Sequence, residues 1–260
     1  MLSYQHGYHA GNLADLHKHI VLATIWRTLK RKPRALSYLD THAGRGRYLL
    51  DDDFAQKTGE WSDGIGAFQT EKGEFAKLIA KHQRVYGENS YMGSVGIIDA
   101  MRDEGDRLIC SELHPQEYAA LKSNFGSDIE AHKRDGYEML LAMSPPKPRR
   151  GLVMIDPSYE VKTEYAEVVE AVRKLLIKWP ECVIAIWYPI LDSHAHHEIE
   201  DGLRLKGRMI CSAEFDRSSQ LRMKGTAMMI LNAPYGLKPD LQSELSYCEK
   251  QYHRLKIATS

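Results

Sequence analysis

The clearest chemical signal is the run Asp156-Pro157-Ser158-Tyr159, which ends a nearly all-apolar stretch, GLVMID. An exocyclic aromatic amine such as adenine N6 is a poor nucleophile because its lone pair is delocalised into the ring. The Asp156 carboxylate and the Pro157 carbonyl could accept its two hydrogens and localise that lone pair, while Tyr159 stacks on an extruded base. The motif predicts group transfer to such an amine. The alternative is a strand that ends in a proline turn with a capping Asp.

A second motif, DTHAGRGR at residues 40–47, ends the first predicted strand. Its glycines let the backbone approach a cofactor closely, as in other glycine-rich turns after a first strand. The motif lacks the third glycine of a dinucleotide-binding fingerprint. It therefore favours a nucleoside cofactor such as S-adenosylmethionine over NAD.

Acidic residues follow each of the first four predicted strands: Asp40, Glu112, Asp135 and Asp156. Glu112 could accept the ribose hydroxyls of a nucleoside, and Asp135 could bind the adenine amine of the cofactor. Each carboxylate alone is typical of a helix cap. Because the carboxyl ends of parallel strands meet at one edge of a sheet, the four together predict a binding site at that edge.

Histidines gather in two places. The first group is His6, His9, His17 and His19, and the second is His194, His196 and His197. No Cys and no H-E-x-x-H pattern accompanies the first group, so we expect contacts with cofactor or RNA there, not a metal. The second group should lie in a solvated loop or at a helix start. We therefore assign no metal.

The elements that must position these motifs alternate between strand and helix patterns. The predicted strands are Ala35–Thr41, Arg107–Glu112, Ile129–Arg134, Gly151–Asp156, Cys182–Tyr188, Met209–Phe215 and Ala227–Asn232. The predicted helices are Asn12–Lys30, Ser94–Met101, Pro115–Asn124, Tyr137–Ala142 and Thr163–Lys178. This order predicts an α/β fold with a doubly wound, mostly parallel, seven-stranded sheet and an N-terminal helix.

Two segments interrupt the alternation. Residues 50–91 carry aromatic and aliphatic residues at helical intervals, and a structureless loop of that length would be unusual. We predict a small helical insertion subdomain there, with residues 1–49 and 92–260 forming the main domain. The tail after Pro239 reads as a terminal amphipathic helix.

Composition excludes few functions. Lys plus Arg equal Asp plus Glu at 35 each, so nucleic acid must be bound by a local basic patch and not by net charge. The four Cys form no CxxC pair, and no apolar stretch reaches 18 residues. We expect a reduced, soluble, cytoplasmic protein without a membrane partner.

The chain resembles the bacterial 23S ribosomal RNA adenine-N6 methyltransferase J family (RlmJ) along nearly its whole length. The resemblance rests on MLSYQHGYHAGNLADLHKH, YLDTHAGRGRY, SELHP, RDGY, RRGLVMIDPSYE, IAIWYP and ILNAPY. It implies a class I Rossmann-like methyltransferase fold with a helical insertion after the first strand. It also implies S-adenosylmethionine as methyl donor and an adenine N6 in free 23S rRNA as target, with the protein acting as a monomer.

Residue roles follow from the matching motifs. The cofactor contacts would be His19, His42, Ser94, Glu112, Asp135, Gly136 and Asp156, the catalytic residues Asp156, Pro157 and Tyr159, and the residues near RNA Tyr4 and Lys18. Two positions depart from the family pattern: Ser158 replaces the second Pro of DPPY, and Val95 replaces the Pro of Gly-Ser-Pro. Neither change removes a group that performs chemistry.

Two other functions remain open. A DNA adenine-N6 methyltransferase would use the same tetrapeptide, although no separate target-recognition domain is evident. Some family members carry an older description that links them to the use of external DNA as a nutrient. A nucleic-acid-binding protein in DNA uptake, with an idle methyltransferase fold, is therefore the second alternative, although it would be expected to have lost acidic groups that are present here.

Overall fold

The computed structural model describes residues 6–216 and 223–259 of the 260-residue chain. Eight strands form one sheet in the order β10-β8-β9-β7-β6-β1-β4-β5. β9 runs antiparallel to β7 and β8, β10 runs antiparallel to β8, and the other neighbours are parallel. The strands are β1 Ser37–Asp40, β4 Arg107–Ser111, β5 Glu130–His132, β6 Gly151–Ile155, β7 Val183–Ile190, β8 Met209–Glu214, β9 Gly225–Leu231 and β10 Arg254–Thr259.

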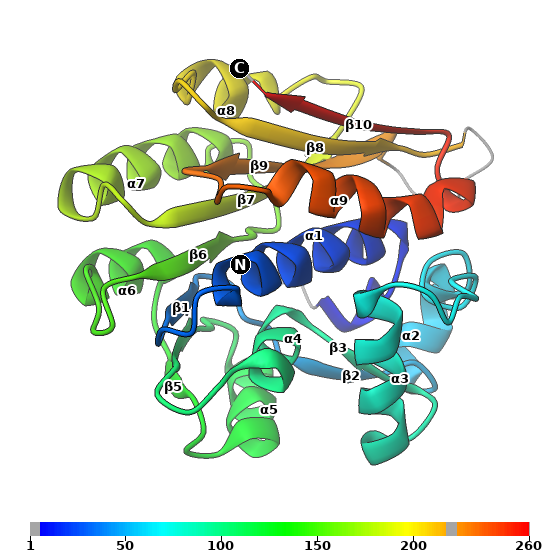
Figure 1. Ribbon diagram of the computed structural model, residues 1–260. Coiled ribbons are helices and arrows are strands. Elements are labelled where there is room, and N and C mark those ends of the chain that lie inside the picture. The colour runs from blue at the N-terminus through cyan, green and yellow to red at the C-terminus, as the bar shows by residue number, and fades with distance from the viewer. Residues whose placement is uncertain (1–5, 217–222, 260) are drawn as a thin grey trace.

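Helices cover both faces of this sheet, as expected for strand–helix alternation. In Figure 1, α1 and α9 lie side by side across one face, and α1 also packs against α4. On the other face α7 contacts both α6 and α8. The helices of the main body are α1 Leu13–Lys30, α4 Ser94–Met101, α5 Pro115–Phe125, α6 Gly136–Met143, α7 Glu164–Lys178, α8 His197–Gly202 and α9 Leu237–Leu245.

The α/β fold expected from the sequence is confirmed. Every predicted strand is present within two residues at each end, because the buried central strands read as uninterrupted apolar runs bounded by polar turns. The helix over Ser94–Met101 has the predicted bounds. No helix among the described residues is long and apolar enough to span a membrane.

Helix α1 is buried along almost its whole length and brings polar residues to the functional edge of the sheet. Asn12 caps it by accepting a hydrogen bond from the Asp15 N–H. Leu16, Ile20 and Trp26 are fully buried against the sheet and its neighbouring helices. Because apolar residues anchor the helix, the polar residues of its first turns can be held in fixed positions inside the protein.

The insertion after β1 contains the expected helices and an unexpected small sheet. Its helices are α2 Asp53–Thr58, the 3-10 turn η2 Glu60–Ser62 and α3 Glu74–Tyr86. The sequence analysis missed β2 Arg47–Leu49 and β3 Ser90–Met92, which pair antiparallel where the insertion leaves and rejoins the chain. Strands of three residues are too short to show an alternation.

The tail is a correction to the sequence analysis. A helix does begin there, with α9 followed by the 3-10 turn η3 Ser246–Gln251, but the chain then forms β10, the eighth strand of the sheet. Leu255 and Ile257 pack partly buried against the core, while Arg254 and Lys256 alternate with them. This period of two, with charged residues on an edge strand, is the signal that the helical interpretation overlooked.

Candidate active site

A cavity of about 300 Å³ lies at the carboxyl edge of the parallel strands. Register places the strand ends together there, since Asp40 of β1 pairs with Cys110 of β4 and with Met154 of β6. Three of the four carboxylates expected at this edge line the cavity: Glu112, Asp135 and Asp156. The other predicted residues that line it are Lys18, His19, His42, Ser94 and Gly136.

Glu112 is held by two backbone groups. Its Oε2 accepts the Gly44 N–H at 2.8 Å and its Oε1 accepts the His114 N–H at 2.7 Å. Burial raises the pKa of Glu112, and these two backbone hydrogen bonds oppose that rise by stabilising the anion. The carboxylate is thus fixed in orientation, and each oxygen keeps a lone pair that can accept from a ligand.

The glycine turn closes tightly around the cavity. Gly44 has φ +57°, and a Cβ there would lie 2.3 Å from the Tyr48 hydroxyl. Gly136 opens α6 so close to β1 that a Cβ would lie 2.1 Å from the Thr41 carbonyl oxygen. Only glycine fits at either position, and the resulting backbone wall has room for a nucleoside-sized ligand beside Glu112.

Asp135 is both a helix cap and a wall of the cavity. Its Oδ1 accepts the N–H groups of Tyr137 and Glu138, each at 2.9 Å, which caps α6. Both of these bonds end on one oxygen, so Oδ2 can accept from a ligand. The two interpretations of this residue from sequence are therefore compatible.

Asp40 does not join the other three carboxylates in the cavity. It is fully buried, and its Oδ2 accepts the hydroxyl groups of Tyr38 at 2.7 Å and Ser94 at 2.6 Å. Burial raises its pKa. The expectation of four acidic ligand groups is thus corrected to three: Asp40 sits beneath the cavity and holds Ser94 in place.

His19 and His42 line the cavity with uncharged imidazole rings. Burial lowers the pKa of His19 to about 3 and that of His42 to about 4. The Nδ1 of His19 lies 2.7 Å from the Tyr91 hydroxyl, and the Nδ1 of His42 lies 2.8 Å from the Thr41 hydroxyl. Both rings are therefore uncharged at neutral pH and add no positive charge to the cavity.

Lys18 forms an ion pair that sequence analysis did not anticipate. Its Nζ lies 2.7 Å from Asp156 Oδ2 and 2.8 Å from Asp15 Oδ1, with only 4% of its side chain exposed. Burial opposes the charge of Lys18, but Asp15 and Asp156 outweigh it and raise the pKa of the ammonium. Asp15 is in turn bound by His6, whose Nε2 lies 2.8 Å from its Oδ2. Lys18 thus fixes one oxygen of the Asp156 carboxylate, which is 14% exposed toward the cavity.

The other members of the tetrapeptide differ from expectation. Tyr159 lies in the core: its hydroxyl donates to the Trp187 carbonyl at 2.6 Å, and its ring packs 4.6 Å from that of Tyr165. Neither Tyr159 nor Pro157 is among the residues that line the cavity, whereas Ser158 is. Stacking of Tyr159 on a base would require that ring to leave the core and stays a prediction. Tyr4 lies outside the described residues.

Further acidic residues that sequence analysis did not single out also face the cavity: Glu117, Glu160, Glu164 and Glu167. Three of them follow the tetrapeptide: Glu160 precedes α7, while Glu164 and Glu167 lie in its first turn. They lie close together: burial raises the pKa of Glu164 most, and the charges of Glu167 and Glu160 add to that rise. A cavity with this many carboxylates attracts a cationic ligand and disfavours an anionic one.

Replacement of Glu112 should weaken cofactor binding selectively. Glu112→Gln places an amide NH2 against one of the two backbone N–H donors, so the side chain loses one hydrogen bond and the negative charge. We expect the affinity for S-adenosylmethionine to fall by about tenfold to a hundredfold, the value of a charged hydrogen bond, with little change in the rate at saturating cofactor. Calorimetry and initial rates measure both; an equal loss in rate and affinity would contradict the assignment.

The fold and the site together define a class I methyltransferase, the class that uses S-adenosylmethionine. A glycine turn follows β1, a fixed carboxylate follows β4, and the Asp of a D-P-x-Y motif follows β6, all at one cavity. The cavity is walled closely by backbone, and its acidic lining suits a cofactor that carries a sulfonium.

Comparison with known proteins places the chain within that class. The family model described as "Ribosomal RNA large subunit methyltransferase D, RlmJ" matches residues 33–256. Proteins named ribosomal RNA large subunit methyltransferase J from Haemophilus influenzae and Escherichia coli are 38% and 37% identical over 96% and 95% of this chain, and over 94% and 92% of their own. The chain belongs to the RlmJ family of methyltransferases, and its cofactor is S-adenosylmethionine.

A solved structure supports the same placement. The crystal structure of a Legionella pneumophila protein superimposes with a TM-score of 0.88 and 28% sequence identity, covering 97% of this chain and 98% of the other. The match therefore extends over most of the helical insertion as well as the central sheet.

Proposed function

We propose that this protein methylates the N6 amine of a specific adenine in 23S ribosomal RNA. The observation that carries the proposal is the position of Asp156: it directly follows β6 as the first residue of Asp-Pro-Ser-Tyr, and Lys18 holds its carboxylate at the wall of the cavity. The related proteins from Haemophilus influenzae and Escherichia coli are named as large-subunit rRNA methyltransferases. The adenine and its N6 are inferred from the tetrapeptide.

Different residues of the chain would bind the cofactor and orient the target amine. When bound, S-adenosylmethionine supplies an electrophilic methyl group. Glu112 would accept the ribose hydroxyls of the cofactor and Asp135 its adenine amine. Asp156 and the Pro157 carbonyl would accept the two N6 hydrogens of the target and localise the nitrogen lone pair. The methylated amine then loses a proton to Asp156 or to water, and most of the rate comes from positioning and electrostatics.

The electrostatics of the cavity favour this use. His19 and His42 are neutral, and the charge of Lys18 is compensated by Asp15 and Asp156, so no unpaired cation among these residues repels a sulfonium. The same acidic lining would repel RNA phosphates. We therefore infer that only the extruded base enters the cavity and that the RNA backbone binds outside it.

The RNA backbone requires a basic surface outside the cavity, and the candidates from sequence are residues 30–34, residues 147–150, and Arg217, Arg222 and Lys224. Residues 30–34 and 147–150 precede β1 and β6, so they lie at the amino edge of the parallel strands, opposite the cavity. Arg217 and Arg222 lie outside the described residues, and Lys224 forms an ion pair with Asp192.

We infer that residues 50–91 act as an insertion subdomain that supports the N-terminal segment beside the cavity, since Tyr8 packs on Phe54 and His9 contacts Glu60. We further propose a cytoplasmic monomer that acts on free rRNA.

Methyl transfer from labelled S-adenosylmethionine to deproteinised 23S rRNA lacking the modification tests the proposal. Assembled large subunits and duplex DNA run in parallel. We expect label on free RNA, recovered as N6-methyladenine, and little on the other two. Label on DNA alone would replace RNA by DNA as the substrate. Label on neither nucleic acid, with cofactor bound normally, would favour the idle-fold alternative.

A further inference from the structure

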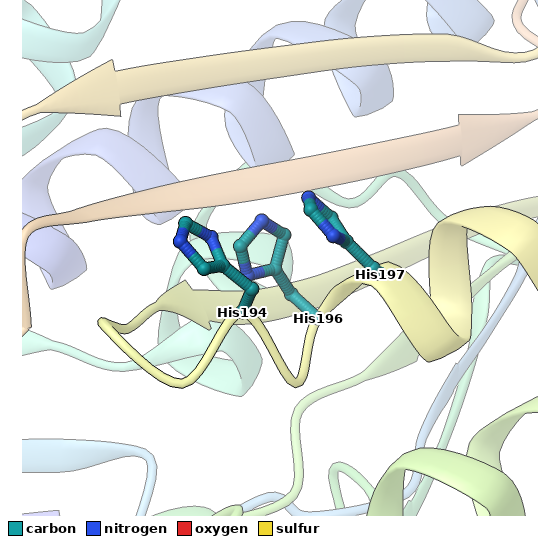
Figure 2. Close-up of side chains that lie close together, drawn as sticks. All are labelled: His194, His196 and His197. Carbon is teal, nitrogen blue, oxygen red and sulfur yellow. The ribbon is translucent and has the colours of Figure 1, made fainter.

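Three histidines converge on the connection that follows β7, away from the cavity described above. His194, His196 and His197 each offer a ring nitrogen, and these nitrogens all lie within 4.8 Å of one another. In Figure 2 the three rings stand side by side on the same side of the backbone that carries them. None of the three lines the cofactor cavity. The three histidines therefore form a group that is separate from the cofactor cavity.

His196 is the fixed member of the group. It is 7% exposed, its ring stacks on Tyr188 at 5.9 Å and 10°, and the Tyr188 hydroxyl donates to Glu200 Oε1 at 2.8 Å. Its Nδ1 is buried and has no hydrogen-bond partner in the described part of the chain. A buried polar atom without a partner is costly, and a ligand bound at this histidine offers a way to compensate that cost. Of the two placements expected from sequence, a solvated loop or a helix start, His196 takes the second, because it directly precedes α8 and is buried.

The other two histidines are exposed and can adjust. The backbone turn brings them to His196: the N–H of His194 donates to the Leu191 carbonyl, and the N–H of His197 donates to that of His194. His194 adopts φ +54°, which is uncommon outside glycine. Their rings stack at 5.3 Å. Ligands of one tetrahedral ion stand roughly 3.3 Å apart when metal–nitrogen bonds are about 2.0 Å, so side-chain rotation alone can close the remaining gap.

We propose that His194, His196 and His197 form a binding site for a divalent transition-metal ion of the Zn²⁺ type. Three imidazoles are the ligand set that suits Zn²⁺, Cu²⁺ or Ni²⁺, and hard ions such as Mg²⁺ prefer oxygen. Three protein ligands leave a fourth position for water. The ion connects the turn that follows β7 to α8, because His194 lies in that turn and His197 is the first residue of the helix.

The test is metal binding by the untagged full-length chain. Zn²⁺ is titrated by calorimetry into the wild-type protein and into His194→Ala/His197→Ala. Both replaced side chains are exposed, so the variant keeps its core. We expect one tight equivalent in the wild type and at least about a tenfold loss of affinity in the variant. The exposed His253, in the segment leading to β10, provides the control His253→Ala, which should bind as the wild type does.

Two further readouts separate a built site from random surface binding. Co²⁺ bound by three imidazoles and water gives the intense visible absorption of a tetrahedral complex, and we expect that spectrum from the wild type and not from the double variant. Zn²⁺ should also raise the melting temperature of the wild type alone, because it binds only the folded state. Equal Zn²⁺ affinity in the wild type and the double variant, or a Co²⁺ spectrum that the double variant retains, would overturn the proposal.

Discussion

Asp156→Ala is expected to abolish measurable methyl transfer to RNA while S-adenosylmethionine still binds. The variant removes the carboxylate proposed to accept an N6 hydrogen and leaves unchanged Glu112 and Asp135, the two carboxylates proposed to bind the cofactor. Loss of one oriented group of this kind lowers the rate by roughly 10²- to 10³-fold or more. Single-turnover transfer to deproteinised rRNA gives the rate, and calorimetry gives the cofactor affinity.

Two control variants make this result specific. Asp156→Asn keeps an oxygen acceptor but loses the charge that pairs with Lys18 at 2.7 Å, so we expect an intermediate rate. Asp201→Ala removes an exposed carboxylate that pairs with Arg204 at the surface and should act as the wild type does. Full activity in Asp156→Ala would refute the assignment of Asp156, and loss of cofactor binding together with activity would reassign it to the cofactor site.

The sequence was sufficient to predict three of the carboxylates that meet at the cavity. Glu112, Asp135 and Asp156 each follow an apolar run, and parallel strands must end at the same edge of their sheet. The glycines after β1 and at the start of α6 likewise indicate a close approach of backbone. These predictions depend only on local periodicity and on one topological rule, which is why they agree with the structure to within a few residues.

What the sequence could not supply are contacts between residues far apart in the chain. Lys18 and Asp156 are separated by 138 positions, and nothing in either motif indicates their pairing. In the sequence, Asp40 resembles the other carboxylates at strand ends. In the structure it is buried, and its Oδ2 accepts hydrogen bonds from the hydroxyl groups of Tyr38 and Ser94. In the sequence, Tyr159 resembles a residue that stacks on a base. In the structure its hydroxyl donates a hydrogen bond to the Trp187 backbone carbonyl in the core. In each case tertiary packing decides between two roles that the residue type permits.

Lys18→Met is the second variant for which we expect a large effect, this time on stability as well as on activity. Methionine matches the lysine side chain as far as Cε and lacks the ammonium group, so Asp15 and Asp156 lose the cation that lies between them. Removal of one partner from a buried ion pair costs about 3–5 kcal/mol, because the remaining charge stays buried. We expect the free energy of unfolding at pH 7, measured by urea denaturation, to fall by about that amount. Methyl transfer should also fall, since Asp156 loses the group that orients it.

The pH dependence of the lost stability in Lys18→Met shows whether the loss comes from the charges of Asp15 and Asp156. Burial alone would raise the pKa of Asp15, but His6 and Lys18 lower it well below its usual value. A carboxylate with a lowered pKa stabilises the fold above its unfolded pKa, and that contribution disappears as the pH falls through the folded pKa. Without Lys18 the pKa of Asp15 must rise, so Asp15 binds a proton at a higher pH and the repulsion between the two carboxylates is relieved.

The stability difference between wild type and Lys18→Met should therefore be largest near pH 7 and shrink on acidification toward pH 5. Lys77→Met removes an exposed lysine that pairs with Glu74 at the surface, and it should change stability little at either pH. A deficit in Lys18→Met that is the same at both pH values would mean that lost packing, and not the charge between Asp15 and Asp156, accounts for the effect. Lys18 would then fill space beside Asp156 without fixing its orientation, and the rate of methyl transfer should survive the substitution.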